Sequence, residues 1–419
     1  MKVFKFGGAS IQSVERIKNT ANIIQSFNSE KLFIIISAMG KTTNALEKVN
    51  EAFFAGDKTT ALLLFNQIKI EHNTIATQLG ILPQAELIIK DIYTEIEWLL
   101  HDKPVRDFDY YYDQIVCSGE LLSTAIISSY LQQNSSPNKW LDVRDIIRTD
   151  DNFREATIDW DFTKAKIYTE IVPLFTSTNI IITQGFIGAT DENESTTLGR
   201  EGSDYSAAIF ANMLQAESLT IWKDVAGVMN ADPKKFADAV IIQALSYNEV
   251  IEMAYYGAQV IHPKTIKPLQ NKNIPLYVRC FLKPDLNGTT ISNTPVNYLP
   301  PIIVVKEKQV MIQLSTKDFS FIGETGIAKL YALFADNKIS PNITQSGAIS
   351  LLCSFDDKPE KIEKFALAAS ELFEVSVEKS ISLLTIRHYT TELVNTMVAA
   401  KTILLTQKTK DTIQLILKD

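Results

Sequence analysis

Four short apolar runs, each followed by polar or glycine residues, constrain the fold of this chain most strongly. Leu32–Ile36 is apolar throughout and is followed by Ser37, and similar runs cover 179–183, 219–222 and 274–278. A continuous apolar run of this length is typical of a strand that is buried on both faces. Segments with helical spacing separate the runs, and strands that alternate with helices form parallel sheets. We therefore expect an α/β fold with a mostly parallel sheet sandwiched by helices.

The N-terminal segment predicts a strand that ends in a glycine turn. Residues 3–6 form the strand, Gly7 and Gly8 form the turn, and Ser10 is placed to cap a helix that follows. A strand, a glycine turn and a helix together can bind phosphate through backbone N–H groups. The Walker A pattern is absent, and Lys5 would reach a phosphate from the sheet.

A second glycine-containing segment, 196–208, combines two glycines with an arginine, a serine and an aspartate. The apolar run 207–213 predicts a helix, and Ser203 and Asp204 are expected at its N-cap. A helix N-terminus favours a phosphate or carboxylate ligand. Because Asp204 would repel a bare phosphate, we expect a metal ion or another positive group beside it. The alternative is a plain glycine turn with a capping aspartate.

The segment between the first and second of these apolar runs is predominantly helical up to about residue 100. Apolar residues recur at three- and four-residue spacing over 44–54, 60–70 and 86–100, which predicts amphipathic helices. We expect a long helical insertion that ends before Ser118-Gly119-Glu120.

A change in composition over 283–301, with three prolines and several Asn and Thr residues, indicates a domain boundary. A short β/α pattern follows, with a strand at 309–314 and two separate strands at 374–378 and 381–387. The residues alone predict a small α+β domain, with a ferredoxin-like fold as one candidate.

Length and composition exclude several classes of protein. A chain of 419 residues is expected to form two or three domains, and its net charge of −8 argues against nucleic acid as a partner. No apolar run reaches the ~18 residues that cross a bilayer, so no membrane partner is expected. Cys117, Cys280 and Cys353 are scattered without metal-type spacing. We expect reduced core cysteines, no metal bound by protein ligands, and a cytoplasmic protein.

The two glycine segments occur together with six further motifs. These are Ser37-Ala38-Met39-Gly40-Lys41-Thr42-Thr43-Asn44, Ser118-Gly119-Glu120, 183–188, 222–233, 252–263 and 339–350. In this order, over nearly the whole chain, they resemble the aspartokinase family. The resemblance implies an amino acid kinase catalytic domain at 1–290 and a regulatory region of two interleaved ACT domains at 301–419. No dinucleotide motif follows before Asp419, so we expect no fused dehydrogenase.

The reaction that the resemblance implies is transfer of the γ-phosphate of ATP to the β-carboxylate of L-aspartate. It gives 4-phospho-L-aspartate and is the first step of lysine, threonine and methionine biosynthesis. Mg²⁺ would be carried by the ATP phosphates. The family motifs place Lys5 and Asp204 as catalytic residues and Thr43, Glu120, Arg200 and Ser203 at the aspartate. They place Gly7, Gly8, Ser37, Lys223, Asp224, Met229, Lys234 and Gln259 at the nucleotide.

Four residues depart from the family pattern. Glu201 stands where many relatives have glycine, Lys223 where threonine is common, Met229 where an aromatic is frequent, and Gln259 where some relatives have lysine. These departures put nucleotide affinity in question rather than the type of reaction. His262 lies in a family motif, but we expect it to be a structural residue at a strand end rather than a catalytic one.

The regulatory motif implies an amino-acid effector near Ser340, Asn342 and Gln345, with lysine and threonine both open and the neutral Asn342 slightly against lysine. ACT domains pair across subunits, so a homodimer or larger oligomer is expected. Two alternatives remain: a kinase of the same fold with another acceptor (glutamate, acetylglutamate or UMP), and a catalytically silent amino-acid sensor.

Overall fold

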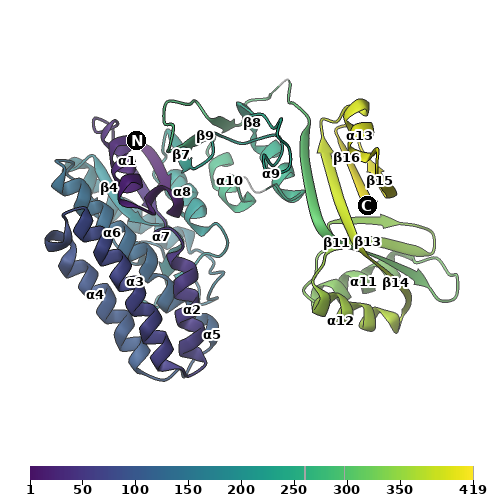
Figure 1. Ribbon diagram of the computed structural model, residues 1–419, viewed down its shortest axis with the longest axis horizontal. Helices are drawn as coiled ribbons and strands as arrows, with labels where there is room; N and C mark the ends of the chain where they lie inside the picture. The colour runs from purple at the N-terminus through teal and green to yellow at the C-terminus, as the bar shows by residue number, and fades with distance from the viewer. Residues whose placement is uncertain (259–260, 297, 419) are drawn as a thin grey trace. The chain divides into compact units, whose positions relative to one another are not determined.

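The computed structural model describes residues 1–258, 261–296 and 298–418 of the chain, and they divide into two compact units (Figure 1). The first unit comprises Met1–Val228, Ile241–Ile251 and Val260–Val296. The second comprises Met229–Val240, Glu252–Gln259 and Asn297–Asp419. Two short segments from the N-terminal part of the chain therefore pack with the C-terminal part, and the domain limits expected from the sequence remain a prediction.

The first unit is built on an eight-stranded sheet in the order β3-β4-β2-β1-β7-β9-β10-β8. The strands pair in parallel except β9 and β10, which are antiparallel. The predicted parallel sheet is thus confirmed. The strands are β1 (Lys2–Phe6), β2 (Leu32–Ile36), β3 (Lys139–Trp140), β4 (Ile180–Gln184), β7 (Ser218–Lys223), β8 (Ala244–Ser246), β9 (Leu276–Cys280) and β10 (Thr289–Ser292), with a separate hairpin of β5 (Ile187–Ala189) and β6 (Ser195–Thr197).

The apolar runs form the central strands because both faces of the sheet are covered. Every residue of β2 and β4 is buried, as continuous apolar strands require. The ring of Phe6 on β1 stacks on Trp222 of β7 at a centroid distance of 5.9 Å. Large aromatic side chains therefore fix the neighbouring strands whose ends carry the polar residues.

Helices cover both faces of this sheet. Helices α6 and α8 are buried along most of their length, which is typical of helices enclosed by other elements. The predicted helical insertion is confirmed as α2–α4, although α3 and α4 are longer than expected, and the two run side by side (Figure 1). The helices are α1 (Val14–Gln25), α2 (Thr42–Phe54), α3 (Lys58–Gln78), α4 (Leu82–His101), α5 (Phe108–Val116), α6 (Ser118–Gln133), α7 (Trp160–Lys166), α8 (Gly202–Met213), α9 (Tyr247–Tyr255) and α10 (Pro263–Gln270).

The second unit contains a six-stranded antiparallel sheet in the order β12-β13-β11-β14-β16-β15. Its helices are α11 (Gly323–Asp336), α12 (Pro359–Ser370) and α13 (Thr391–Val398). The α+β expectation is confirmed. The strands are β11 (Ile302–Thr316), β12 (Ile343–Ser346), β13 (Ser350–Asp356), β14 (Phe373–Arg387), β15 (Thr402–Lys408) and β16 (Thr412–Lys418).

Two long strands join the two halves of this sheet. The strands expected separately at 374–378 and 381–387 are one strand, β14, and β11 starts seven residues before the expected Gln309. Their pairing shifts register between Lys306 and Met311. One half packs on α11 and α12 through a core that includes Phe334, Phe355 and Phe365, and the other half has its own core around Ile386 and Leu415.

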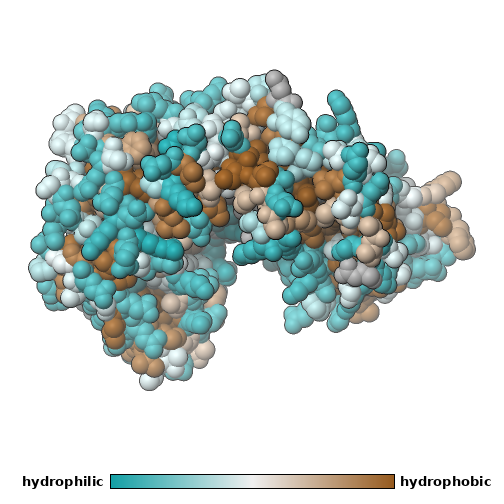
Figure 2. Space-filling model, turned by 45° about the horizontal axis from the view of Figure 1, so that its top comes forward, coloured by the Kyte–Doolittle hydropathy of each residue, from teal (hydrophilic) through white to brown (hydrophobic). Residues whose placement is uncertain are grey.

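No helix among the described residues is both long enough and apolar enough to span a bilayer. On the face drawn in Figure 2, hydrophilic and hydrophobic residues are mixed over the surface. The cysteines Cys117, Cys280 and Cys353 are free thiols and are buried, as expected.

Candidate active site

The carboxyl ends of strands β1, β2 and β7 bring Lys5, Ser37 and Lys223 together. β1 lies between β2 and β7, with Lys5 opposite Ile35 and Ile221. Ser37 directly follows β2, and Lys223 is the last residue of β7. Because the carboxyl ends of parallel strands lie at one edge of a sheet, these side chains belong to one site.

The glycine turn after β1 is shaped by close backbone contacts. A Cβ on Gly8 would lie 2.6 Å from the Ala38 carbonyl oxygen, so only glycine fits there. A Cβ on Gly7 would lie 3.4 Å from Lys5 Nζ, which places the ammonium group of Lys5 beside the turn. Ser10 does not cap α1, because it lies in a short 3₁₀ helix that precedes α1, and Ser13 caps α1 instead.

Asp204 is the centre of a charged cluster. Its Oδ1 lies 2.6 Å from Lys5 Nζ, and its Oδ2 lies 3.8 Å from Lys223 Nζ. The side chains of Lys5 and Asp204 are only 11% and 5% exposed. Burial alone would raise the pKa of Asp204, but the two ammonium groups hold it below its ordinary value. The positive charge expected beside Asp204 is thus supplied by Lys5, and Lys223 adds a second cation.

The expected N-cap position of Ser203 and Asp204 is wrong. Helix α8 begins at Gly202, so both residues lie in its first turn, and Glu201 is the N-cap. Glu201 has a left-handed backbone with φ of 55°. Gly199, with φ of 75°, also turns in the left-handed region, so the backbone turn rather than a polar cap determines where the helix begins.

Glu120 lies in the first turn of α6 and is almost fully buried. One carboxylate oxygen accepts a hydrogen bond of 3.2 Å from the Ala38 N–H. The other oxygen has no hydrogen-bond partner in the described part of the chain. Burial raises the pKa of Glu120 to about 8, although the Ala38 N–H and the charge of Lys5 oppose the shift. A buried acid with an unsatisfied oxygen is suited to receive a cationic group.

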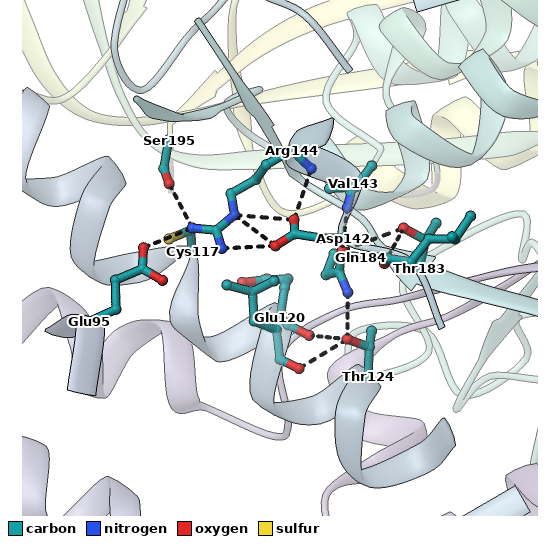
Figure 3. Close-up of polar contacts among 12 residues, drawn as sticks. Glu95, Cys117, Glu120, Thr124, Asp142, Val143, Arg144, Thr183, Gln184 and Ser195 are labelled. Atoms are coloured by element: carbon teal, nitrogen blue, oxygen red, sulfur yellow. Dashed lines mark hydrogen bonds and ion pairs between the residues drawn. The ribbon is translucent and has the colours of Figure 1, made fainter. Parts of the chain in front are cut away.

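A polar network that the sequence did not reveal holds α6 against β4 (Figure 3). Thr124 donates to the Glu120 carbonyl at 2.9 Å and accepts from Gln184 Nε2 at 2.7 Å. The Gln184 Oε1 accepts from the Val143 N–H at 2.7 Å. Gln184 ends a fully buried strand, and a polar residue at such a position was the one available signal. The network fixes the turn of α6 that carries Glu120.

Figure 3 also shows Arg144 between Asp142 and Glu95, with distances of 2.8 and 2.9 Å. Cys117 lies nearby, fully buried, and donates to the Gln114 carbonyl. Burial raises the pKa of its thiol to about 12. Cys117 is therefore a core residue, as expected.

The other residues expected at the aspartate have different surroundings. Ser203 is buried, and a Cβ on Gly185 would lie 2.6 Å from its Cβ, so β4 and α8 approach very closely. Thr43 is half-buried in the first turn of α2. Arg200 is exposed, and its guanidinium group forms no ion pair with the described residues.

The expected nucleotide residues are only partly brought together. Lys223 joins the cluster at Asp204, and Asp224 is exposed beside it. Met229 and Lys234 belong to the second compact unit, where Met229 is half-buried and Lys234 is exposed. Gln259 lies outside the described residues.

In the second unit, Ser340 and Asn342 line a cavity of about 310 Å³, but Gln345 is not among its lining residues. Asn342 Oδ1 accepts from Lys306 Nζ at 2.6 Å, and its Nδ2 donates to Gln309 at 2.8 Å and to Asp356 at 3.0 Å. Burial lowers the pKa of Lys306, although the charge of Asp356 opposes this. Lys306, Gln309 and Asp356 were not identified from the sequence, because the network joins β11 and β13.

Comparison with known proteins assigns the family. The model of the amino acid kinase family matches residues 1–280. The chain is 34% identical over 304 residues to a bifunctional aspartokinase/homoserine dehydrogenase of Zea mays, which covers 70% of this chain and 32% of that protein. It is 32% identical over 406 residues to aspartokinase 1 of Arabidopsis thaliana, covering 90% of this chain and 66% of the relative. The chain thus spans about a third of the length of the maize relative.

The fold also matches a solved structure described as E. coli aspartokinase III in complex with aspartate and ADP. The TM-score is 0.82 with 25% sequence identity, and the match covers 100% of this chain and 96% of the other. The matched region includes the strand ends, the glycine turn and the loop before α8 that form the site described above. The chain belongs to the amino acid kinase family, and the similar proteins named here are aspartokinases.

Proposed function

We propose that this protein is an aspartate kinase that transfers the γ-phosphate of ATP to the β-carboxylate of L-aspartate and forms 4-phospho-L-aspartate. One observation carries the proposal: the buried Lys5–Asp204 pair and the unsatisfied carboxylate oxygen of Glu120 occur in one site. The first supplies positive charge for a phosphoryl group, and the second suits the ammonium group of an amino acid. The relatives with the same arrangement of elements are aspartokinases.

Phosphoryl transfer depends mainly on position and charge. Lys5 and the N–H groups of Gly7 and Gly8 would contact the transferred group, and Lys223 would add charge on the nucleotide side with Asp224, Met229, Lys234 and Gln259. Asp204 holds Lys5 in place through its 2.6 Å ion pair. ATP would carry Mg²⁺ on its phosphates and on water, as this ion prefers. Binding of Mg²⁺ by ATP and water, rather than by Asp204, agrees with the structure, because the two carboxylate oxygens of Asp204 already face two lysines.

The acceptor would be held at both ends. Glu120 would receive its ammonium group, while Arg200, Ser203 and Thr43 would bind carboxylate oxygens, since guanidinium groups match carboxylates well. The β-carboxylate is itself the nucleophile: its oxygen bonds to the γ-phosphorus as the bond to the β-phosphate oxygen breaks and ADP leaves. No strong general base is therefore needed.

Regulation and assembly follow from the second unit. We propose that its two halves are interleaved ACT domains that bind an amino-acid effector, lysine or threonine, near Ser340, Asn342 and Gln345. Pairing of these domains between two chains would give a homodimer or a larger oligomer. The cytoplasmic location expected from the sequence stays a prediction.

The test measures ADP release and hydroxylamine-trapped acyl phosphate with Mg-ATP and L-aspartate, with glutamate, acetylglutamate and UMP as competing acceptors. Hydroxamate is expected with aspartate alone. Asp204→Asn should lower kcat by about 10²–10³, the typical loss for one preorganised electrostatic group. Asp191→Asn, an exposed carboxylate in the same unit, is the matched control and should retain activity.

Unchanged turnover in Asp204→Asn would overturn the mechanism. Turnover with another acceptor alone would replace aspartate as the substrate. Binding of an amino acid without turnover in any condition would favour the silent sensor.

A further inference from the structure

Glu201 combines an unfavourable backbone with a long-range hydrogen bond. Its φ of 55° lies in the region that favours glycine. Its side chain does not cap α8. Instead, Glu201 Oε2 accepts a 3.0 Å hydrogen bond from the backbone N–H of His262, which is 61 positions away in the sequence. A residue that keeps a left-handed backbone without being glycine needs a compensating interaction, and this bond supplies one.

The partner of this bond directly precedes another helix. His262 is the N-cap of α10, and its Nδ1 accepts from the Lys264 N–H at 3.2 Å. Backbone N–H groups at a helix start lack partners within the helix, and a carboxylate satisfies one of them favourably. The charge of Glu201 is therefore directed at the start of α10. His262 therefore lies at a helix start rather than at the strand end expected for it.

The backbone of Glu201 meanwhile organises the start of α8. Its carbonyl accepts from the N–H groups of Asp204 and Tyr205 at 3.0 and 3.1 Å, and the Gly202 N–H donates to Gly199. Arg200 immediately precedes Glu201, and Asp204 lies in the turn that follows. A single residue thus connects the loop of Arg200, the first turn with Asp204, and the start of α10.

We propose that Glu201 is a positioning residue that ties the Arg200–Asp204 loop to α10 and so presets the site for the acceptor. The inference rests on the proposed function for its kinetic readout only. The hydrogen bond from the His262 N–H to Glu201 would fix a turn whose backbone would be flexible with glycine at this position. Arg200 and Asp204 would then be ordered before the acceptor binds. Ordering before binding lowers the entropy that binding costs.

Three substitutions separate the effect of the Glu201 side-chain hydrogen bond from that of its left-handed backbone. Glu201→Gly removes the tie and relieves the backbone, Glu201→Ala removes the tie and keeps the left-handed residue, and Glu201→Gln keeps an oxygen that can accept the bond. The Gly and Ala variants should raise KM for the acceptor by about three- to ten-fold, the factor expected for one ordinary hydrogen bond. The Gln variant should stay within about two-fold of the wild type.

A matched control is available on the same pair of helices. Asn212 Nδ2 donates to the Pro268 carbonyl at 2.7 Å and joins α8 to α10 away from the loop. Asn212→Ala should lower the melting temperature and leave KM for the acceptor unchanged. Hydrogen exchange provides a readout that needs no turnover: the His262 amide should exchange faster in the Gly and Ala variants and at the wild-type rate in Asn212→Ala.

Faster exchange at His262 with raised KM in the Gly and Ala variants alone supports the inference. Unchanged exchange, unchanged KM in both variants, or an equal rise of KM in Asn212→Ala would overturn it. If the wild-type protein phosphorylates no aspartate, the proposed function fails. In that case the exchange of the His262 and Asp204 amides decides the inference by itself.

Discussion

The two buried carboxylates of the candidate active site have opposite electrostatic surroundings. Asp204 faces two lysine ammonium groups, and its pKa is lowered despite burial. Glu120 has no cation in hydrogen-bonding contact among the described residues, and burial raises its pKa to about 8. Asp204 is consequently charged near neutral pH, whereas Glu120 holds a proton until a cation arrives. The two roles proposed for them, holding Lys5 and receiving an ammonium group, follow from this difference.

This difference predicts a pH dependence of acceptor binding. Binding of an ammonium group favours the ionised form of Glu120, so below pH 8 the bound acceptor must displace a proton. KM for aspartate should therefore fall as the pH rises from about 6.5 to 8, with a limiting slope of about tenfold per pH unit. The measurement is KM for aspartate and for ATP across this range. Glu120→Gln should bind aspartate more weakly and lose the slope.

KM for ATP serves as the internal control and should not follow the same curve. An equal slope in Glu120→Gln would show that another group titrates.

The raised pKa of Glu120 also makes the stability of the fold depend on pH. The folded protein keeps a proton on Glu120 that the unfolded chain releases above its ordinary pKa of 4.5, so this group makes folding less favourable as the pH rises from 4.5 to about 8.

At the scale of elements, α5 holds the strand that leads into the loop of Arg200. Asp113 is fully buried on α5, and its carboxylate accepts from the Thr197 N–H at 2.8 Å, the Thr197 hydroxyl at 2.7 Å and the Arg154 N–H at 2.9 Å. Thr197 is the last residue of β6. Three donors meet at one carboxylate, so its loss leaves buried groups unsatisfied.

Asp113→Asn should therefore lower the free energy of unfolding by about 1–3 kcal/mol, because the amide has one accepting oxygen instead of two and lacks the charge that strengthens these hydrogen bonds. Urea denaturation monitored by fluorescence measures the change. Asp109→Asn is the control on the same helix, since Asp109 is exposed and pairs with the exposed side chain of Arg154. It should change stability by less than about 0.5 kcal/mol. Equal losses in both variants would contradict the proposed importance of the buried contacts.

Individual helices and strands show which parts of the fold the sequence could predict. The run Leu32–Ile36 was recognisable because a strand covered on both faces needs apolar residues at every position. The start of α8 was predicted wrongly because Ser203 and Asp204 are good N-cap residues by type. Left-handed turns at Gly199 and Glu201 move the helix start before them, and a non-glycine residue gives no sequence signal for such a turn.

At the scale of the whole molecule, the contacts that matter join distant parts of the sequence. Local pattern identified Lys5, Glu120 and Asp204 as candidates, whereas the pairing of Lys5 with Asp204 and the bond from Ala38 to Glu120 depend on the order of strands in the sheet. The length of β14 was also missed, because Ser380 has a left-handed backbone within the strand. Register shifts of this kind are set by tertiary pairing rather than by the local sequence.

The last consequence links the second unit to activity. Lys306 Nζ donates a 2.6 Å hydrogen bond to Asn342 Oδ1. Its ammonium group is close to Asp356 and to the cavity that Ser340 and Asn342 line. The ammonium group of free lysine would meet a like charge there, which is unfavourable. Wild-type activity should therefore be weakly sensitive to lysine. Lys306→Met keeps the stem that packs on Gly257 but removes the charge, and it should lower the lysine concentration for half-inhibition by about three- to ten-fold.

Inhibition curves with lysine and with threonine at fixed aspartate and ATP test this expectation. The basal kcat should stay within about two-fold, because Lys306 lies outside the candidate active site. Lys329→Met is the control: this exposed lysine of α11 does not line the cavity, so the same substitution there should leave the response to lysine unchanged. If Lys306→Met responded to lysine as the wild type does, the charge of Lys306 would have no part in selecting the effector. If threonine alone became more effective, the cavity would discriminate by size rather than by charge, since threonine lacks the second ammonium group that the like-charge argument requires.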